Sequence, residues 1–180
     1  MNHQPNIRNG FTLVEMLVVI AILGILMAMM VPAAGLIMKR MAKARAQSDA
    51  SVVATVLLKY QAEYNRWPAT YVPETRDTTD MEWVDMMGPK PGSGPVAANP
   101  KRILFFEPGG GALGTVSPNI GAFVDPWGKP FKFRLDRDGA GKMANPDEDK
   151  GGEIPYRAVA WSAGPDGDYA TWPDNVKSWE

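Results

Sequence analysis

The hydrophobic and polar positions of this chain follow three different patterns. An apolar run without charged residues extends from Met16 to Met38, and a helix needs roughly 20 such residues to cross a bilayer. From about Arg45 onward the pattern is amphipathic, and after Asp125 apolar and charged residues alternate. In order, these patterns predict a buried or membrane-spanning helix, a helix with one packed face, and half-buried β-strands.

The amphipathic segment continues the apolar run without a turn signal between them. Its large apolar residues recur at steps of three and four, so they share one helix face that packs on a head domain. Because Pro68 disfavours helix at the residue before it, we predict a single helix over about residues 11–66, far longer than a bilayer is thick. The residues of the packed face are Val53, Val56, Leu57, Tyr60, Tyr64 and Trp67.

Two residues predict a deformation of the apolar half. Pro32 removes one helical hydrogen bond and its ring collides with the preceding turn, while Gly24 is a weak helix former. A kink at Gly24 and Pro32 is one interpretation. The other is that membrane helices simply tolerate both residues, and the sequence leaves the two open.

Residues 69–121 are rich in Pro, Gly and Asn, which predicts a long loop region. Within it, the apolar residues of Arg102–Glu107 predict one strand. A long loop in a compact domain is either functional or mobile.

Residues 122–180 predict an antiparallel sheet. Phe131, Phe133 and Leu135 alternate with charged residues, which indicates a strand with one buried face, and Tyr156–Ser162 predicts the next strand. The expected fold class is α+β, with one long N-terminal helix, transmembrane in its first half, packed on a small C-terminal antiparallel β-sheet.

Composition narrows the chemistry. The chain has 180 residues, with 19 basic against 20 acidic, so its charge does not favour a nucleic-acid partner. There is no cysteine, and His3 is the single histidine. If residues 1–10 are removed from the mature chain, His3 is removed with them. A mature chain without His and Cys excludes a nucleophile of the Cys or Ser–His type and a zinc site built on His or Cys. We therefore expect no enzyme.

A six-residue motif stands at the start of the apolar run: Gly10-Phe11-Thr12-Leu13-Val14-Glu15. A carboxylate at membrane depth costs roughly 2.5 kcal/mol or more, and the helix dipole offsets only roughly 0.3–1 kcal/mol of that. Glu15 therefore needs a positively charged partner. The motif resembles the prepilin-peptidase recognition motif of type IV pilins and type II secretion pseudopilins.

That resemblance implies a domain organisation. Residues 1–10 would be a leader removed after Gly10, residues 11–38 the transmembrane or filament-core half of the helix, residues 39–66 its amphipathic half, and residues 67–180 the globular head. The new terminal residue Phe11 would be N-methylated. A plain signal anchor, which keeps its N-terminus, is the alternative.

The resemblance also implies a role for Glu15 in assembly. Its carboxylate would pair with the amino terminus of Phe11 in an adjacent copy and set the register of the filament. The alternative is a glutamate that only faces the positive end of the helix dipole.

The resemblance places the protein in the inner membrane as a single-pass protein with its head in the periplasm, and the assembled filament in the cell envelope or outside the cell. The charges argue the other way. Four basic residues follow the apolar run, whereas only Arg8 and the amino terminus precede it. The positive-inside rule would therefore put the side that follows the run in the cytoplasm. The four are Lys39, Arg40, Lys43 and Arg45. We follow the motif because it is more specific.

Two further segments resemble the major pseudopilin of type II secretion systems. Asp125-Pro-Trp-Gly-Lys-Pro-Phe131 resembles the strand entry of that family, and Ser162-Ala-Gly-Pro-Asp-Gly167 resembles the start of its C-terminal loop. Residues 69–121 fit the family poorly, being longer and differently composed.

In the resembling pseudopilins the C-terminal loop binds one calcium ion. Carried over, Ala163 would supply a carbonyl oxygen and Asp166, Asp168 and Asp174 carboxylates. Oxygen ligands of these kinds suit Ca²⁺. The alternative is a set of aspartate turns with solvated carboxylates. A second acidic segment, Asp136–Gly141, lacks a complete calcium loop, and we predict a hairpin turn there.

The function implied is a structural subunit of a type II secretion pseudopilus that assembles into a helical filament and drives protein export. Its partners would be further copies, prepilin peptidase, and an inner-membrane assembly platform with its ATPase. One alternative is a major type IV pilin for adhesion, motility or DNA uptake. Another is a membrane-tethered binding module, whose signature would be exposed tryptophans among Trp83, Trp172 and Trp179.

Overall fold

The structure is a computed structural model. It describes residues 11–67, 75–78, 83, 98–107, 109, 112–115 and 122–180, without the side chains of residues 30–34. Two compact units divide the chain, residues 1–41 and residues 42–180. The leader 1–10 and most of the loop region 69–121 lie outside the described residues, and so does the side chain of Pro32. The leader, the kink at Gly24 and Pro32 and the domain boundaries stay predictions.

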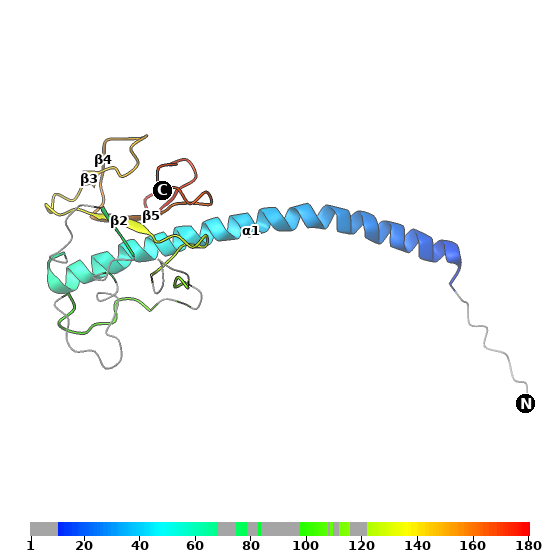
Figure 1. Cartoon of the computed structure of the whole chain (residues 1–180), viewed down its shortest axis with the longest axis horizontal. Helices are drawn as coiled ribbons and strands as arrows, with labels where there is room; N and C mark the ends of the chain where they lie inside the picture. The colour runs from blue at the N-terminus through cyan, green and yellow to red at the C-terminus, as the bar shows by residue number, and fades with distance from the viewer. Residues whose placement is uncertain are drawn as a thin grey trace, which may run out of the picture. The chain divides into compact units, whose positions relative to one another are not determined.

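Helix α1 extends over Leu13–Tyr64 (Figure 1) and confirms the prediction of one long helix. It ends two residues before the predicted boundary because Asn65 takes a left-handed conformation, with φ of 49°. A residue in that conformation directly after the last helical turn is a common helix stop. The helix therefore ends at Tyr64, before the position of Pro68, which lies outside the described residues.

Strands β1 to β6 form two antiparallel sheets, which confirms the α+β class. The four-stranded sheet has the order β1-β2-β5-β6, and the two-stranded sheet pairs β3 with β4. The two central strands fall within the predicted segments, and Phe133 of β2 is paired with Ala160 of β5. The bounds are β1 Thr75–Asp77, β2 Lys132–Leu135, β3 Met143–Ala144, β4 Glu153–Ile154, β5 Ala158–Ser162 and β6 Val176–Lys177.

The predicted strand Arg102–Glu107 is wrong, since these residues form no strand. Arg102 has φ of 56°, which breaks an extended course, and the Asn99 side chain instead binds both the N–H and the C=O of Ile103, at 2.9 and 2.8 Å. The hairpin predicted at Asp136–Gly141 is also wrong. That segment is a turn, but it joins β2 to β3, which belong to different sheets.

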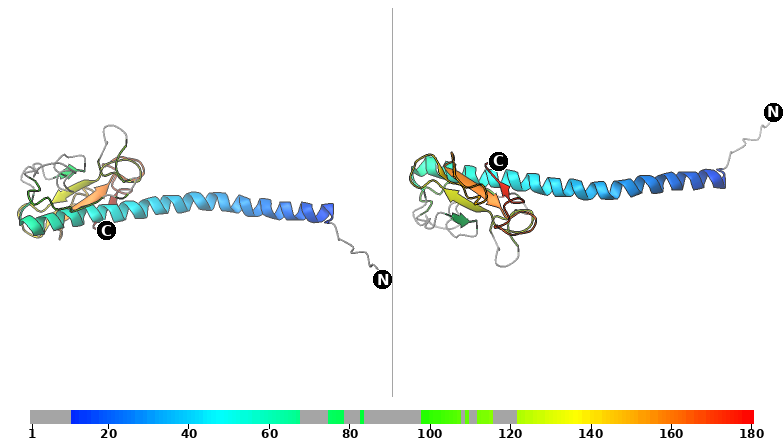
Figure 2. Two further views of the ribbon diagram at one scale, coloured as in Figure 1. Left: turned by 90° about the horizontal axis from the view of Figure 1, so that it is seen from below. Right: turned by 90° about the horizontal axis from the view of Figure 1, so that it is seen from above.

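The sheet lies beside the C-terminal part of α1, as the two views of Figure 2 show. The head core is built from residues of both elements. The predicted apolar face of the helix is confirmed, with Val53, Leu57 and Tyr60 fully buried. Phe131 and Phe133 pack from the sheet side, and both are 0% exposed. The apolar residues that recur every helical turn on α1 and those that alternate along the strands therefore pack together in one core.

Strand β5 is buried along its whole length. Ala158 and Ala160 belong to the core against α1. The ring of Trp161 instead contacts Trp172 and Trp179, at centroid distances of 5.8 and 6.1 Å. Segments from the C-terminus therefore cover the second face of the sheet. Trp83 and Trp172 are buried core residues, and Trp179 is half-buried.

Candidate functional site

The first turn of α1 is closed by a reciprocal pair, Thr12 and Glu15. Glu15 Oε2 accepts hydrogen bonds from the backbone N–H and the hydroxyl of Thr12, both at 2.8 Å. In return the backbone N–H of Glu15 donates to Thr12 Oγ1 at 3.2 Å. This is a capping box, in which two helix-end N–H groups that lack helical partners are satisfied by side chains. Glu15 therefore has a local structural role besides its predicted role in assembly.

The first unit leaves its apolar surface uncovered. The large apolar side chains from Leu13 to Met29 and from Leu36 to Met41 are 45–80% exposed. A contiguous apolar surface of this kind marks a site of protein or membrane interaction. Phe11, at the start, is 75% exposed. Gly10, the predicted cleavage position, lies outside the described residues.

Across the described residues, no helix combines the length and the apolarity that crossing a membrane requires. The membrane span predicted over residues 11–38 is therefore not shown by the structure.

The two C-terminal motifs found in the sequence meet in space. Asp125 Oδ2 accepts a hydrogen bond of 2.6 Å from the Ser162 hydroxyl, and Ser162 Oγ accepts one of 3.0 Å from the Gly164 N–H. The second oxygen of Asp125 accepts the N–H groups of Trp127 and Lys129, at 3.0 and 2.8 Å. Burial raises the pKa of Asp125, and these hydrogen bonds oppose that rise. The buried carboxylate thus ties the turn before β2 to the loop after β5.

The predicted metal ligands lie in this loop. Asp166 Oδ1 accepts the Asp168 N–H at 2.8 Å, and Asp168 Oδ1 accepts the Ala170 N–H at 2.9 Å, so both carboxylates shape tight turns. Both are exposed, while Ala163 is fully buried. No group of three or more His, Cys, Asp or Glu side chains in the described part of the chain could hold a metal ion.

Asp174 differs from the other two carboxylates. Its Oδ1 is buried and has no hydrogen-bond partner among the described residues. Its backbone oxygen lies so close to Gly164 that a Cβ there would be 2.5 Å away. The structure therefore brings Asp174 against the start of the loop, next to the predicted carbonyl ligand Ala163.

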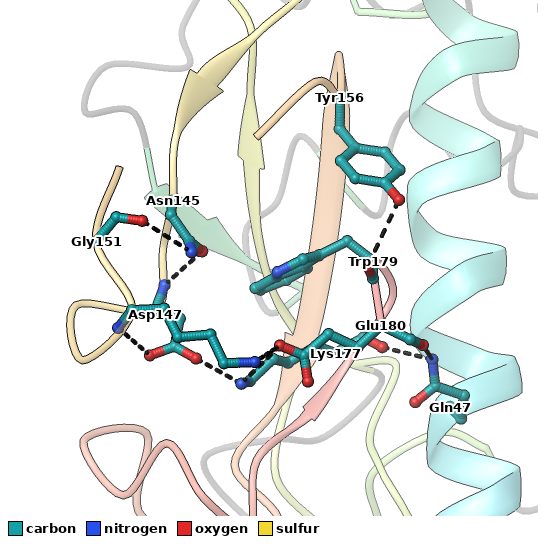
Figure 3. A network of polar contacts seen from close by, with 9 residues as sticks. Gln47, Asn145, Asp147, Gly151, Tyr156, Lys177, Trp179 and Glu180 are labelled. Carbon is teal, nitrogen blue, oxygen red and sulfur yellow. Dashed lines mark hydrogen bonds and ion pairs between the residues drawn. The ribbon is translucent and has the colours of Figure 1, made fainter. Parts of the chain in front are cut away.

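A second polar cluster holds the C-terminus (Figure 3). Lys177 Nζ forms an ion pair of 2.5 Å with Asp147 Oδ2, and the two side chains are only 6% and 2% exposed. Glu180 Oε1 contacts the ammonium groups of both Lys177 and Lys150. On α1, the Gln47 amide donates to the backbone oxygens of Lys177, at 2.5 Å, and Glu180, at 3.0 Å. We call these five residues the C-terminal latch.

The latch shifts the acidity of its members. Burial alone raises the pKa of Asp147, but the hydrogen bond and charge of Lys177 outweigh burial and hold the pKa below its ordinary value. The hydrogen bond from Lys150 lowers the pKa of Glu180. Both carboxylates are therefore held in their charged form.

Sequence reasoning missed three of these relationships. The spacing of Thr12 and Glu15 ahead of an apolar run is a known capping signature and could have been found. The bond of Asp125 to Ser162 and the ion pair of Asp147 with Lys177 join residues 37 and 30 positions apart. No local spacing signals such contacts.

Comparisons with known proteins match the N-terminal motif and a large part of the chain. A model of the prokaryotic N-terminal methylation motif matches residues 5–31. The type II secretion system core protein G of Pseudomonas aeruginosa is 29% identical over 129 residues, which cover 70% of this chain and 72% of that protein. No solved structure matches the chain.

The methylation motif and the similarity to core protein G together support a type IV pilin-like protein. Within that class, the similarity to core protein G supports a pseudopilin-like chain.

Proposed function

We propose that this chain is a structural subunit of a type II secretion pseudopilus. In this proposal prepilin peptidase cleaves after Gly10, Phe11 is methylated, and the mature chains assemble into a helical filament that drives protein export. The observation that carries the proposal is the methylation motif over residues 5–31. An exposed apolar surface begins within this motif, at Leu13, and among the described residues it continues to Met41, and such a surface marks an interaction site.

The uncovered apolar helix surface supports assembly on physical grounds. Burying apolar surface stabilises by about 25 cal/mol per Å², and neighbouring copies offer each other the same surface. Before assembly the inner membrane would cover it, with the head in the periplasm. Assembly would then move the helix from lipid to the filament core.

Glu15 would supply the register. Its Oε2 already accepts two hydrogen bonds from Thr12, but neither donor carries a positive charge. An amino terminus of an adjacent copy would neutralise the charge of the carboxylate inside the apolar filament core. A charge left unpaired there is strongly unfavourable, so a misplaced copy would be rejected. The assembly platform and its ATPase would be the partners that insert each copy.

The test is the intact mass of the protein isolated from its native envelope, followed by sequencing of its N-terminal peptide. A chain that begins at methylated Phe11 supports the proposal. A chain that retains residues 1–10 contradicts it and leaves the membrane-tethered module. Deletion of the gene then separates the filament functions, because loss of exoprotein secretion indicates a pseudopilus, whereas loss of adhesion, motility or DNA uptake indicates a type IV pilus.

We also propose that the C-terminal loop holds Ca²⁺ when the ion is present. The loop offers oxygen ligands of the kind that Ca²⁺ prefers. Asp174 Oδ1 is a buried carboxylate oxygen without a hydrogen-bond partner in the described structure, and the side-chain amide oxygen of Asn175 is likewise buried without a partner. Ala163 would add a carbonyl oxygen, and Asp166 and Asp168 are the remaining carboxylates of the loop. The ion would supply structural cross-linking and no chemistry.

The calcium proposal is tested by thermal unfolding with calcium against chelator. A ligand at 100 times its dissociation constant stabilises by about 2.7 kcal/mol, so calcium raises the midpoint in the wild type and not in Asp174→Ala. Magnesium is the control ion, because it demands smaller octahedral sites. An unchanged midpoint in the wild type would contradict the proposal.

A further inference from the structure

Three arginines gather at the end of the head where α1 stops. Arg66, Arg137 and Arg157 line a cavity of about 350 Å³ together with one carboxylate, Asp138. All three arginines are exposed, and within the described residues no ion pair joins any of them. We call this site the arginine cavity. Its three positive charges against one negative charge favour an anionic occupant.

The backbone around the arginine cavity is held in place. The indole N–H of Trp67 donates to the carbonyl of Asp136 at 2.6 Å, which ties the turn after β2 to the segment after the helix. The N–H of Asp136 donates to the carbonyl of Arg157 at 2.8 Å. The three arginines therefore come from three segments whose positions are mutually fixed, and guanidinium groups suit bidentate binding of carboxylates.

An exposed acidic pair lies elsewhere on the same head. Glu148 and Asp149 are both exposed and stand between Asp147 and Lys150, the two loop residues of the C-terminal latch. We call this pair the acidic corner. Its loop is anchored on both sides, so the pair is presented without the loop having to be ordered first.

Two basic residues border the acidic corner in a cavity of about 370 Å³, Lys132 and Arg134. Neither forms a described ion pair with the acidic corner. The ammonium of Lys132 lies 4.1 Å from the ring centre of Tyr169, and Arg134 donates to the carbonyl of Ala144 at 3.2 Å. Both cations are thus engaged with other groups.

The two charged sites lie at different heights along α1. The latch fastens the acidic corner's loop to residues that Gln47 holds, whereas Arg66 lies two residues after Tyr64, the last residue of the helix. At 1.5 Å per residue the helix rises roughly 26 Å between Gln47 and its last residue, Tyr64. The head therefore carries a cationic site near one end and an anionic site near the other.

We propose that the arginine cavity of one copy receives the acidic corner of a second copy. This inference rests on the proposed function, which it deepens by naming a contact between heads. Two different complementary patches on each subunit make a heterologous contact, and contacts of that kind generate open filaments when the rotation does not close. The separation of the two patches along the helix suits such head-to-tail stacking.

Engineered cysteines test the contact directly, because the chain has no cysteine of its own. The full chain with Arg66→Cys and Glu148→Cys is assembled in a host that supplies prepilin peptidase and the secretion apparatus, then oxidised. Because roughly 26 Å of helix separates the two ends of the head, we expect no disulfide within one chain, which needs Cα atoms within about 7 Å. A ladder of cross-linked multimers is the expected result. Each single-cysteine variant is a control and yields at most dimers.

Charge reversal provides a second, independent measurement. Arg137→Glu and Glu148→Arg each place like charges opposite one another, and we expect filament-bound protein to fall roughly tenfold. The two changes combined in one chain restore opposite charges and recover assembly. Lys59→Glu is the matched control, since Lys59 is exposed on α1 and outside both sites, and it leaves assembly unchanged.

The outcomes separate this contact from the proposed function. If the wild type forms no filament, the proposed function fails. If the wild type forms filaments but the double-cysteine chain gives no ladder, or reversals have no effect, the head contact is overturned. Recovery in the doubly reversed chain excludes misfolding as the cause of either single loss.

Discussion

The carboxylate of Asp125 accepts a 2.6 Å hydrogen bond from the hydroxyl of Ser162, and the two residues are 3% and 0% exposed. This bond joins the turn before β2 to the loop after β5, so the two motifs that the sequence marks as separate form one structural unit. Because Ser162 also accepts the N–H of Gly164, the unit sets the start of the proposed calcium loop.

Replacing Ser162 by alanine should destabilise the head. The change leaves a buried carboxylate oxygen and a buried N–H without partners, and such losses cost about 1–3 kcal/mol each. Urea unfolding of the full chain in detergent, followed by tryptophan fluorescence, measures the loss. Thr55→Ala is the control, because its hydroxyl is exposed on α1 and bonds only the carbonyl of Ser51. A loss no larger than in Thr55→Ala would contradict the role of the buried bond.

Breaking the buried pair of the C-terminal latch should have a larger effect. Lys177→Met leaves Asp147 charged and buried without its partner, which costs roughly 3–5 kcal/mol. Combining Lys177→Met with Asp147→Leu removes both charges and should recover most of that loss. Lys150→Met, which breaks an exposed pair with Glu180, should cost less than about 1 kcal/mol. Equal losses in the single and double variants would show that packing rather than charge pairing dominates.

The latch also predicts an acid limit of stability. The pKa of Asp147 is lower in the folded than in the unfolded chain. Its contribution is therefore complete above the unfolded value, about 3.9, and is lost as pH falls through the folded pKa. Unfolding free energies measured from pH 6 downward should decrease in the wild type below about pH 4. The Lys177→Met, Asp147→Leu chain should lose less, and parallel curves would contradict the assignment.

Glu15 allows its two roles to be separated. Glutamine also serves at the third position of a capping box, so Glu15→Gln keeps the cap but removes the charge. Thr12→Val removes the cap, which costs about 1 kcal/mol of helix stability, but keeps the charge. If the charge directs assembly, Glu15→Gln should lose filaments and Thr12→Val should retain them. The yield of sheared filaments measures both, and the reverse result would assign Glu15 to helix capping alone.

Two glycines separate backbone conformation from crowding. Gly164 and Gly128 both have positive φ, 71° and 85°. A Cβ at Gly164 would also lie 2.5 Å from the backbone oxygen of Asp174, whereas a Cβ at Gly128 meets nothing within 4 Å. Gly128→Ala should cost about 1 kcal/mol from φ alone. Gly164→Ala should cost clearly more and weaken calcium binding, as thermal unfolding with and without calcium would measure.

Much of the fold could be predicted from the local spacing of apolar residues in the sequence. The three- and four-residue steps from Val53 to Tyr60 belong to a helix because they repeat every turn, and the alternation from Phe131 to Leu135 belongs to a strand because side chains point to opposite faces. Strand β1 had no such pattern, because it consists of Thr75–Asp77 and contains no apolar residue. It is a strand only because Thr75–Asp77 pairs with β2.

By itself the sequence determined the long helix, the pilin-like N-terminal motif, the packed helix face and the two central strands. Each is encoded by neighbouring residues whose spacing matches a backbone period. The tertiary structure alone decided the bond of Asp125 with Ser162, the pair of Asp147 with Lys177, and the gathering of Arg66, Arg137 and Arg157. These contacts depend on which segments, distant in the sequence, the packed core brings together. The spacing of residues along the chain does not show which distant segments will meet.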